Sequence, residues 1–403
     1  MKKHKNNFGK RTGLFAAAFI FAAGILITGC QNKKAEDTEV TEETTAEIVT
    51  TEAPTQPAKA LVNGEYFDFD TVALDLSGSI VEDVKQLSEE LKTLTGLTTV
   101  ELYDCNLTTG DEVYLRESLP EVDFGYMVSL DGIEYDSRTE EIDISNGVID
   151  DLEVFCSEVK AFSGLNKLIM CDTNLSNEQM EYLMNQVPAV KFVWNVTLGL
   201  WTIRTDTVAF STLKDGSITY RLTNEDCQVL KYCTDMYALD LGHNFVTDIS
   251  FLQYMPDLKI LILVDDRMVG EDGYWDESMG YIQDLSYLKY VPKLVYLEFF
   301  VGSVQDLSFL QYLPNLVDLN ISYNPISDVT WLLNLPKLQR LFLEHTNLTE
   351  EDYALLQATY PNAQVVYYGE GSVDQGWRTH ERYYAMKDMY DKNYINDIFE
   401  NLP

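Results

Sequence analysis

The nine residues Asp306-Leu-Ser-Phe-Leu-Gln-Tyr-Leu-Pro314 have three close copies in the chain, at residues 248–256, 284–292 and 328–336. The four copies begin at intervals of 36, 22 and 22 residues. A unit that recurs at so short a period cannot bury its apolar side chains alone, so it stacks on its neighbours. The recurrence therefore predicts one continuous array of stacked units in the C-terminal half of the chain.

Each copy is flanked by the six-residue frame Leu-x-x-Leu-x-Leu, as at Leu316, Leu319 and Ile321. In this frame, alternate apolar side chains of a short strand point into the core, and the strands of successive units pair in parallel. The pattern resembles leucine-rich repeats, and the 22-residue version resembles internalin-type repeats of bacterial surface proteins. The resemblance implies an α/β leucine-rich-repeat solenoid, with short parallel strands on the concave face and helical, 3-10 or extended segments on the convex face.

The N-terminal half of the chain repeats at a longer period. Residues 80–107 align without a gap with residues 148–175, at an offset of 68 residues. Each of these long units contains two strand frames with a helical pattern of apolar residues between them. Alternating apolar residues after Pro120 and Pro188 predict a further strand pair in each unit. We therefore expect one solenoid built from two repeat lengths.

These patterns divide the array into three parts. The long units occupy residues 61–215, and repeats of 22–25 residues occupy residues 216–368, with an insertion near residues 265–281. Residues 369–403 depart from the repeat. Because the open end of a solenoid exposes its core, we expect this tail to form a C-terminal cap. The side chains available for the cap are those of Trp377, Tyr383, Tyr384, Met386 and Tyr390.

The N-terminus has the features of an export signal. Residues 1–13 carry five basic and no acidic side chains, and residues 14–28 form an apolar run. The run ends in Ile27-Thr28-Gly29-Cys30, which resembles the bacterial lipobox. We predict a lipoprotein signal peptide at residues 1–29, lipidation of Cys30, and anchoring to the outer face of the bacterial cytoplasmic membrane. The alternative is an uncleaved anchor with an incidental cysteine.

The segment that follows, residues 30–60, combines the lipidated cysteine with a Thr-rich, acidic stretch without aromatic residues, for which we predict a disordered tether. Beyond the tether, residues 192–206, 230–244 and 376–387 resemble segments of leucine-rich-repeat lipoproteins of anaerobic Firmicutes. By pattern, that resemblance covers about residues 60–395. It implies the fold and a location at the cell surface, and it implies no particular ligand.

The concave face of the shorter repeats is the candidate binding surface. In the frame, strand alternation points the third, fifth and seventh positions to this side. Apolar side chains gather there with acidic residues around them, and an exposed apolar patch with a polar rim marks a partner site. The predicted partner-binding residues are Asp240, Ile260, Ile262, Val264, Tyr296, Glu298, Phe300, Asp318 and Asn320.

The insertion offers another cover for this patch. The repeat that begins at Leu258 is 14 residues longer than its 22-residue neighbours, and the extra stretch contains Met268, Tyr274, Trp275 and Met279. These side chains are able to fold over the concave patch. The sequence leaves three arrangements open: a partner covers the patch, the insertion covers it, or the two form one site.

Composition and motifs exclude several function classes. A formal net charge of −36, from 65 acidic and 29 basic residues, argues against nucleic-acid binding, which needs Lys and Arg on phosphates. Four scattered histidines and six cysteines without a CxxC motif predict no metal and no cofactor. The sequence has no GxSxG, P-loop or HExxH motif, and residues 265–277 do not match the EF-hand spacing. A disulfide between Cys227 and Cys233 stays an open alternative.

The sequence favours a non-catalytic binding module at the cell surface. We expect a monomer that recognises a protein or glycan through its concave face, with the acidity of the array favouring basic or apolar partners. One alternative is an envelope-associated enzyme with a site in the long units, where Trp194, Trp201 and Arg204 cluster. Another alternative is a purely structural spacer.

Overall fold

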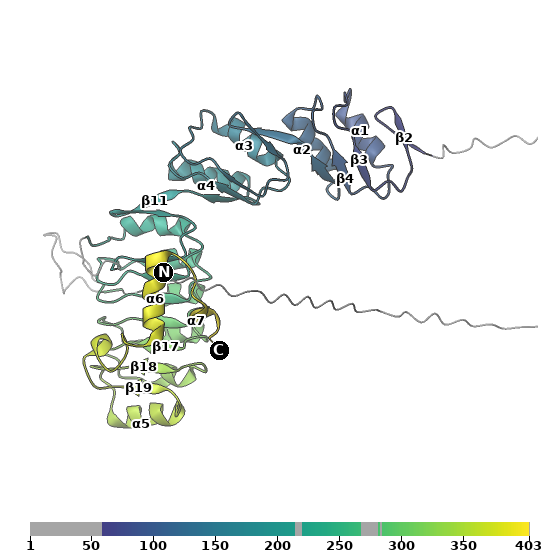
Figure 1. The fold of residues 1–403 in the computed structure, drawn as a ribbon. Helices are drawn as coiled ribbons and strands as arrows, with labels where there is room; N and C mark the ends of the chain where they lie inside the picture. The colour runs from purple at the N-terminus through teal and green to yellow at the C-terminus, as the bar shows by residue number, and fades with distance from the viewer. Residues whose placement is uncertain (1–58, 214–219, 267–280, 283, 403) are drawn as a thin grey trace, which may run out of the picture. The chain divides into compact units, whose positions relative to one another are not determined.

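The computed structural model describes residues 59–213, 220–266, 281–282 and 284–402 (Figure 1). The predicted signal peptide, Cys30 and nearly all of the predicted tether lie outside these residues, as does most of the insertion near residues 265–281. The described residues belong to one compact unit. Among the described helices, none has both the length and the apolar character that crossing a bilayer requires.

A short antiparallel hairpin of β1 (Ala60–Val62) and β2 (Glu65–Phe67) precedes two long units. The first unit consists of β3 (Ala73–Asp75), α1 (Val84–Leu91), β4 (Thr99–Glu101), α2 (Thr109–Ser118), β5 (Asp123–Gly125), β6 (Met127–Leu130) and β7 (Ile133–Asp136). The second consists of β8 (Glu141–Asp143), α3 (Leu152–Ala161), β9 (Lys167–Ile169), α4 (Asn177–Gln186), β10 (Lys191–Val193), β11 (Asn195–Leu198) and β12 (Trp201–Arg204). Each element of the second unit begins 68 residues after its counterpart, which matches the sequence offset.

The four helices of the long units begin at side chains that cap them. The carboxylates of Asp83 and Asp151 accept hydrogen bonds from the free N–H groups of the first turns of α1 and α3. Thr108 and Ser176 begin α2 and α4 in capping boxes with the side chains three residues later. The local sequence therefore determines where each helix begins, and its apolar face then packs on the strands.

The strands of each long unit form a small parallel sheet followed by a hairpin. The sheets β3-β4-β5 and β8-β9-β10 are parallel, whereas the hairpins β6–β7 and β11–β12 are antiparallel. The hairpin joins its sheet in the same way in both units. The hydroxyls of Ser137 and Thr205 accept hydrogen bonds, both of 3.2 Å, from the N–H groups of Tyr126 and Trp194.

The shorter repeats build one parallel sheet of seven strands in a single register. Its strands are β13 (Ala209–Ser211), β14 (Ala238–Asp240), β15 (Ile260–Ile262), β16 (Tyr296–Glu298), β17 (Asp318–Asn320), β18 (Arg340–Phe342) and β19 (Gln364–Val366). The convex side carries the 3-10 helices η1 (Asp226–Tyr232), η2 (Ser250–Tyr254), η3 (Leu285–Tyr290), η4 (Ser308–Tyr312) and η5 (Thr330–Asn334), followed by α5 (Glu350–Thr359). The fourth positions of the frames pair strand by strand and are buried: Leu239, Leu261, Leu297, Leu319 and Leu341. The fold is a leucine-rich-repeat solenoid, as the sequence predicts.

Asparagines hold the turns that follow the strands. The buried Asn324 amide donates to the carbonyls of Phe299 at 2.8 Å and Ile321 at 3.0 Å, and its carbonyl accepts from the Val304 N–H at 3.1 Å. Asn244 holds the turn after β14 in a similar way. A buried amide that satisfies several backbone groups stabilises a turn that lacks its own ladder of hydrogen bonds.

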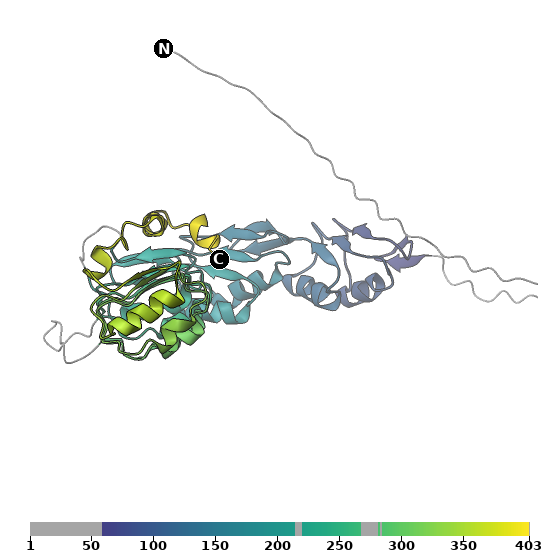
Figure 2. The same cartoon turned by 90° about the horizontal axis from the view of Figure 1, so that it is seen from below.

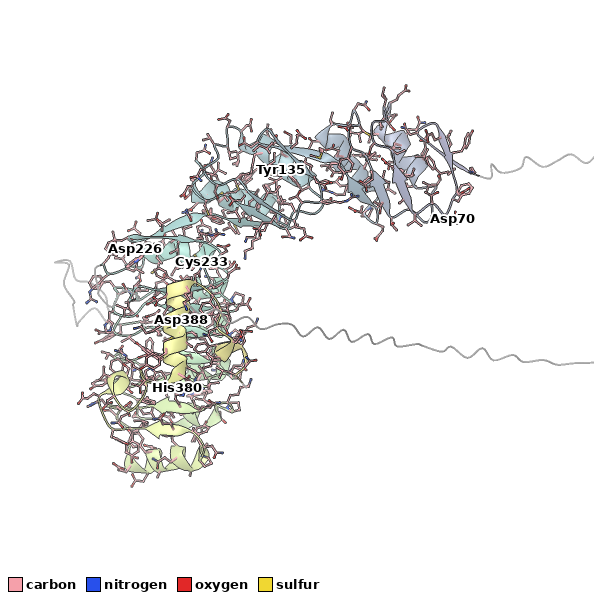
Figure 3. All side chains as sticks on the ribbon, in the orientation of Figure 1. Asp70, Tyr135, Asp226, Cys233, His380 and Asp388 are labelled. Atoms are coloured by element: carbon pink, nitrogen blue, oxygen red, sulfur yellow. The ribbon has the colours of Figure 1, made fainter. Side chains whose placement is uncertain are left out.

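The tail after β19 forms η6 (Gly371–Val373), α6 (Glu381–Lys392) and α7 (Asp397–Glu400). His380, labelled in Figure 3, begins α6 by accepting a hydrogen bond on Nδ1 from the Arg382 N–H at 3.2 Å. Figure 1 shows α6 crossing in front of the strands, and Figure 2 shows the same helix end-on above the sheet. The tail therefore lies across the concave face, whereas the sequence led us to expect a cap on the end of the solenoid.

Candidate functional site on the concave face

The concave side of the seven-stranded sheet carries the nine residues that the sequence predicts for partner binding. Eight of them are at most 7% exposed, and Phe300 is half-buried. The prediction that they form an exposed patch is wrong, because the C-terminal tail packs on them in a second apolar cluster. That a partner contacts these residues stays a prediction. The insertion, which was the other candidate cover, lies largely outside the described residues.

Trp377 anchors the tail to the sheet. Its side chain is fully buried, and its ring centroid lies 5.1 Å from that of Tyr296 on β16 and 4.9 Å from that of Phe342 on β18. The guanidinium carbon of Arg340 lies 4.5 Å from the centre of the indole. Aromatic packing and a cation–π contact both contribute where water is excluded. The tail is therefore a packed part of the core.

Asp318 forms a buried ionic centre between the sheet and the tail. Its Oδ1 accepts from Arg340 Nε at 2.7 Å, and its Oδ2 lies 2.7 Å from Arg382 Nε on α6. The three side chains are at most 7% exposed. Such a group adds little net stability, because desolvation offsets most of the Coulomb attraction. Its geometry instead determines which residues of the tail meet which strands.

A cavity of about 320 Å³ remains between α6 and strands β13–β16. Its floor includes Asp240, Glu298 and the apolar side chains of Ile262 and Val264. The tail supplies its other wall, and sequence reasoning did not single out the charged residues there. The tail residues that line the cavity are Arg378, Tyr383, Met386, Lys387, Tyr390 and Asp391. The only feature of the sequence that pointed to these residues was the mixture of basic and aromatic side chains in the tail, which departs from the repeat.

Burial controls the ionisation of the two acids in the cavity floor. Asp240 accepts hydrogen bonds from the Gly242 N–H at 3.0 Å and the Ser211 hydroxyl at 2.8 Å. Burial nevertheless raises its pKa, because the hydrogen bonds only partly replace water. Burial also raises the pKa of Glu298, whose Oε2 accepts from the Tyr296 hydroxyl at 3.2 Å. The floor therefore favours a positively charged or hydrogen-bond-donating occupant.

The residues suggested for an enzyme in the long units are engaged in structural contacts. Trp194 is 4% exposed, and its indole N–H donates to Asn177 Oδ1 at 2.9 Å. Trp201 packs edge-on against Phe210, with the ring centroids 5.9 Å apart. Arg204 pairs with a neighbouring aspartate, Asp206, at 2.7 Å. The structure thus places these side chains in packing and ion pairs around β11–β13, and no catalytic arrangement arises from them in the described residues.

The described cysteines are all free thiols: Cys105, Cys156, Cys171, Cys227 and Cys233. Cys227 and Cys233, the latter labelled in Figure 3, are buried and unpaired, and burial raises the pKa of the Cys233 thiol to about 12. The disulfide alternative is therefore wrong. Within the described ranges, no group of three or more His, Cys, Asp or Glu side chains is placed to hold a metal ion.

The convex side carries an aromatic row that sequence reasoning missed. Tyr254, Tyr290 and Tyr312 end η2, η3 and η4, and they are 43%, 40% and 41% exposed. The three 3-10 helices are neighbours in the array. The signal was present in the sequence, because these tyrosines occupy the seventh position of the nine-residue copies. We refer to the three residues as the tyrosine row.

Comparison with known proteins supplies no family for this chain. No protein-family model matches the sequence, and no curated protein matches it. Among solved structures, an internalin from Listeria monocytogenes is 17% identical, with 75% of this chain and 83% of that chain covered and a TM-score of 0.29. Internalin C2 from the same organism is 21% identical over 40% of this chain and 80% of its own, with a TM-score of 0.27.

A leucine-rich-repeat protein from Leptospira interrogans is 11% identical, with 72% of this chain and 96% of that chain covered and a TM-score of 0.27. At these identities and TM-scores, the likeness carries no argument about this chain. The fold assignment for this chain rests on its own strand register and buried leucines.

Proposed function

We propose that this chain is a binding module at the cell surface, anchored by lipid on Cys30, that recognises a protein partner through the tyrosine row. The tyrosine row carries the proposal, because three aromatic side chains stay exposed at equivalent positions of successive repeats. Tyrosine is enriched in protein interfaces, where it contributes large contact area at low entropic cost. The repeat array itself provides the rigid support that such a surface needs.

The concave face is the less favourable place for the partner. To open it, Trp377, Met386, Met389, Tyr390 and Phe399 must all leave their buried positions. At about 1.5–3 kcal/mol for each large side chain, this release costs roughly 8–15 kcal/mol. A partner on the concave face would need to supply that free energy before it gained any affinity. A partner on the tyrosine row meets a surface that is already accessible.

Site-specific photocrosslinking tests where the partner binds. A benzophenone amino acid replaces Tyr290 in the full chain, which is then exposed to envelope and extracellular extracts and irradiated. The matched control replaces Tyr384, which is 58% exposed on the tail. We expect a discrete covalent adduct from position 290 and none from position 384. Equal adducts at both positions, or none at position 290, would contradict the proposal.

A third crosslinking position, Phe300, tests the concave alternative, because this side chain is half-buried at the edge of the covered face. Adducts at position 300 without adducts at position 290 would place the partner on the concave side. The anchor is tested separately by the variant Cys30→Ala with metabolic lipid labelling. We expect the label to disappear, whereas unchanged labelling would exclude Cys30 as the modified residue.

A further inference from the structure

The cavity between α6 and the sheet is lined by buried polar atoms, both donors and acceptors, that lack hydrogen-bond partners. The Tyr390 side chain is 6% exposed and lines the cavity, yet its hydroxyl has no hydrogen-bond partner among the described residues. Arg378 Nε is also buried without a hydrogen-bond partner, and Glu298 Oε1 has no hydrogen bond of standard geometry, although the Trp377 indole lies close enough to lower the pKa of Glu298. A buried polar atom left unpaired is costly, so groups of this kind indicate an occupant that satisfies them.

From this arrangement we propose that the cavity binds a free α-amino acid with an apolar side chain. The proposal does not depend on the protein partner proposed above. At about 320 Å³, the cavity lies at the lower end of the range of ~300–1,000 Å³ for small-molecule pockets. Its size suits a ligand of one residue.

The acceptors in the cavity fit the ammonium group. Glu298 and Asp240 lie on neighbouring parts of the floor, and the Tyr390 hydroxyl belongs to α6 above them. Each carboxylate already accepts hydrogen bonds from the protein, but these bonds do not neutralise its charge. A protonated amine supplies three N–H donors and the missing positive charge. Its binding favours the ionised form of both acids, which burial disfavours.

The donor in the cavity fits the carboxylate of the ligand. Arg378 lies close enough to Asp240 and Glu298 to influence both, but no salt bridge of 4.0 Å or less joins it to either acid in the described structure. A guanidinium group separated from its carboxylates leaves room for a zwitterion between them. Ile262, Val264 and Met386 offer an apolar wall for the side chain of the ligand. The exposed Lys387 and Asp391 lie at the rim.

Isothermal titration of the full chain with L-leucine tests the proposal. Two analogues serve as matched probes: isoamylamine lacks the carboxylate, and 4-methylpentanoate lacks the amine. We expect saturable binding of L-leucine and at least about tenfold weaker binding of each analogue, since each loses a charge-assisted hydrogen bond. Absence of L-leucine binding would mean that water alone fills the cavity and would overturn the proposal. Binding of isoamylamine as tight as that of L-leucine would also overturn it.

Variants locate the binding in this cavity. Glu298→Gln should weaken L-leucine binding by about tenfold or more, and Tyr390→Phe should weaken it by about threefold to tenfold. Tyr390→Phe retains the packed ring, so it stays informative if Glu298→Gln does not fold. The matched control is Tyr384→Phe, which removes an exposed hydroxyl from the same helix and should leave the affinity unchanged. Unchanged affinity in Tyr390→Phe and Glu298→Gln would place any binding elsewhere and overturn the proposal.

Discussion

Asp75 in the first long unit and Asp240 in the shorter repeats occupy the same position of their strands. Each ends the sequence Ala-Leu-Asp, and each accepts a 3.0 Å hydrogen bond on Oδ1 from the N–H two residues later. Their ionisation nevertheless differs in direction. Hydrogen bonds from Ser77 lower the pKa of the exposed Asp75, whereas burial raises the pKa of Asp240. Local sequence determines the hydrogen bond, whereas burial under the tail determines the direction in which the pKa shifts.

The two halves of the chain differ most in the residues that face away from the strand core. In the long units these are charged and mostly exposed, as at Asp75, Glu141 and Asp143. In the shorter repeats they are buried, and apolar side chains such as Ile260 and Ile262 lie beside charged ones such as Asp318. A sheet face with apolar outward residues requires a cover, and a face with charged residues does not. The tail is the cover that the shorter repeats require.

Removal of the tail should have the largest effect. In a chain that ends at Tyr368, the concave cluster loses side chains worth roughly 8–15 kcal/mol of burial, which is comparable to the whole stability of a domain. We expect loss of cooperative thermal unfolding and strong binding of a hydrophobic dye, measured by calorimetry and fluorescence. A truncated chain with the melting temperature of the full chain would show that the tail is a dispensable lid.

Disruption of the ionic centre should have the next largest effect. Asp318→Ala leaves two buried arginines unpaired, and we expect the free energy of unfolding to fall by about 3–5 kcal/mol. The matched control is Glu101→Ala in the first long unit, where the partly exposed pair with Arg138 is worth about 1 kcal/mol or less. Chemical denaturation of both variants measures the difference. Equal losses would mean that the concave face is as open to solvent as the first sheet.

The covered face should also change how stability depends on pH. Burial raises the pKa of Glu344 from 4.5 to about 7, so between these values the folded chain holds a proton that the unfolded chain releases. The favourable contribution of Glu344 to the free energy of unfolding is complete below pH 4.5 and is lost as the pH rises through 7. We expect Glu344→Gln to reduce the loss of stability between pH 5 and 8 by roughly 1–3 kcal/mol.

The control for this experiment is Asp75→Asn, because the pKa of this exposed carboxyl is lowered rather than raised. Its favourable contribution is present above the ordinary pKa and is lost only as the pH falls through the lowered value. Asp75→Asn should therefore leave the profile between pH 5 and 8 unchanged. Identical profiles of the wild type and Glu344→Gln in this range would contradict the burial of Glu344.

The smallest effect on stability is expected at the tyrosine row. Tyr290→Ser removes a side chain that is 40% exposed, and the free energy of unfolding should change by about 0.5 kcal/mol or less. Capture of the protein partner should nevertheless fall strongly. A large loss of stability without a loss of capture would assign this tyrosine to the fold instead of to a binding surface.

The repeat unit was the most predictable part of the molecule. The period of 22 residues, the buried leucines and the asparagine turns follow from local alternation, which each unit repeats independently of the others. The 68-residue offset also located both long units, since the same caps and strands recur in each. The location of the tail was not predictable in this way. It depends on contacts between residues far apart in sequence, such as Asp318 with Arg382, and the repeat pattern carries no information about such pairs.

The candidate site, too, could be predicted from the sequence only in part. Strand alternation correctly placed Ile260, Tyr296 and Asp318 on the concave side, but the sequence alone did not show what covers them. The half of the cavity that belongs to the tail, with Arg378 and Tyr390, depends on the position of α6 above the strands (Figure 2). Outward-facing apolar residues in the strands predicted that some cover exists, and the identity of that cover required the tertiary structure.

Hydroxyl-radical footprinting of the full chain in solution tests most directly whether the tail covers the concave face. The rates of side-chain oxidation are compared for Trp377, Met389 and Tyr296, which are buried between tail and sheet, and for the exposed Tyr384 on the same helix. We predict that the three buried side chains react much more slowly than Tyr384. Oxidation of Trp377 and Tyr296 as fast as that of Tyr384 would contradict the covered concave face.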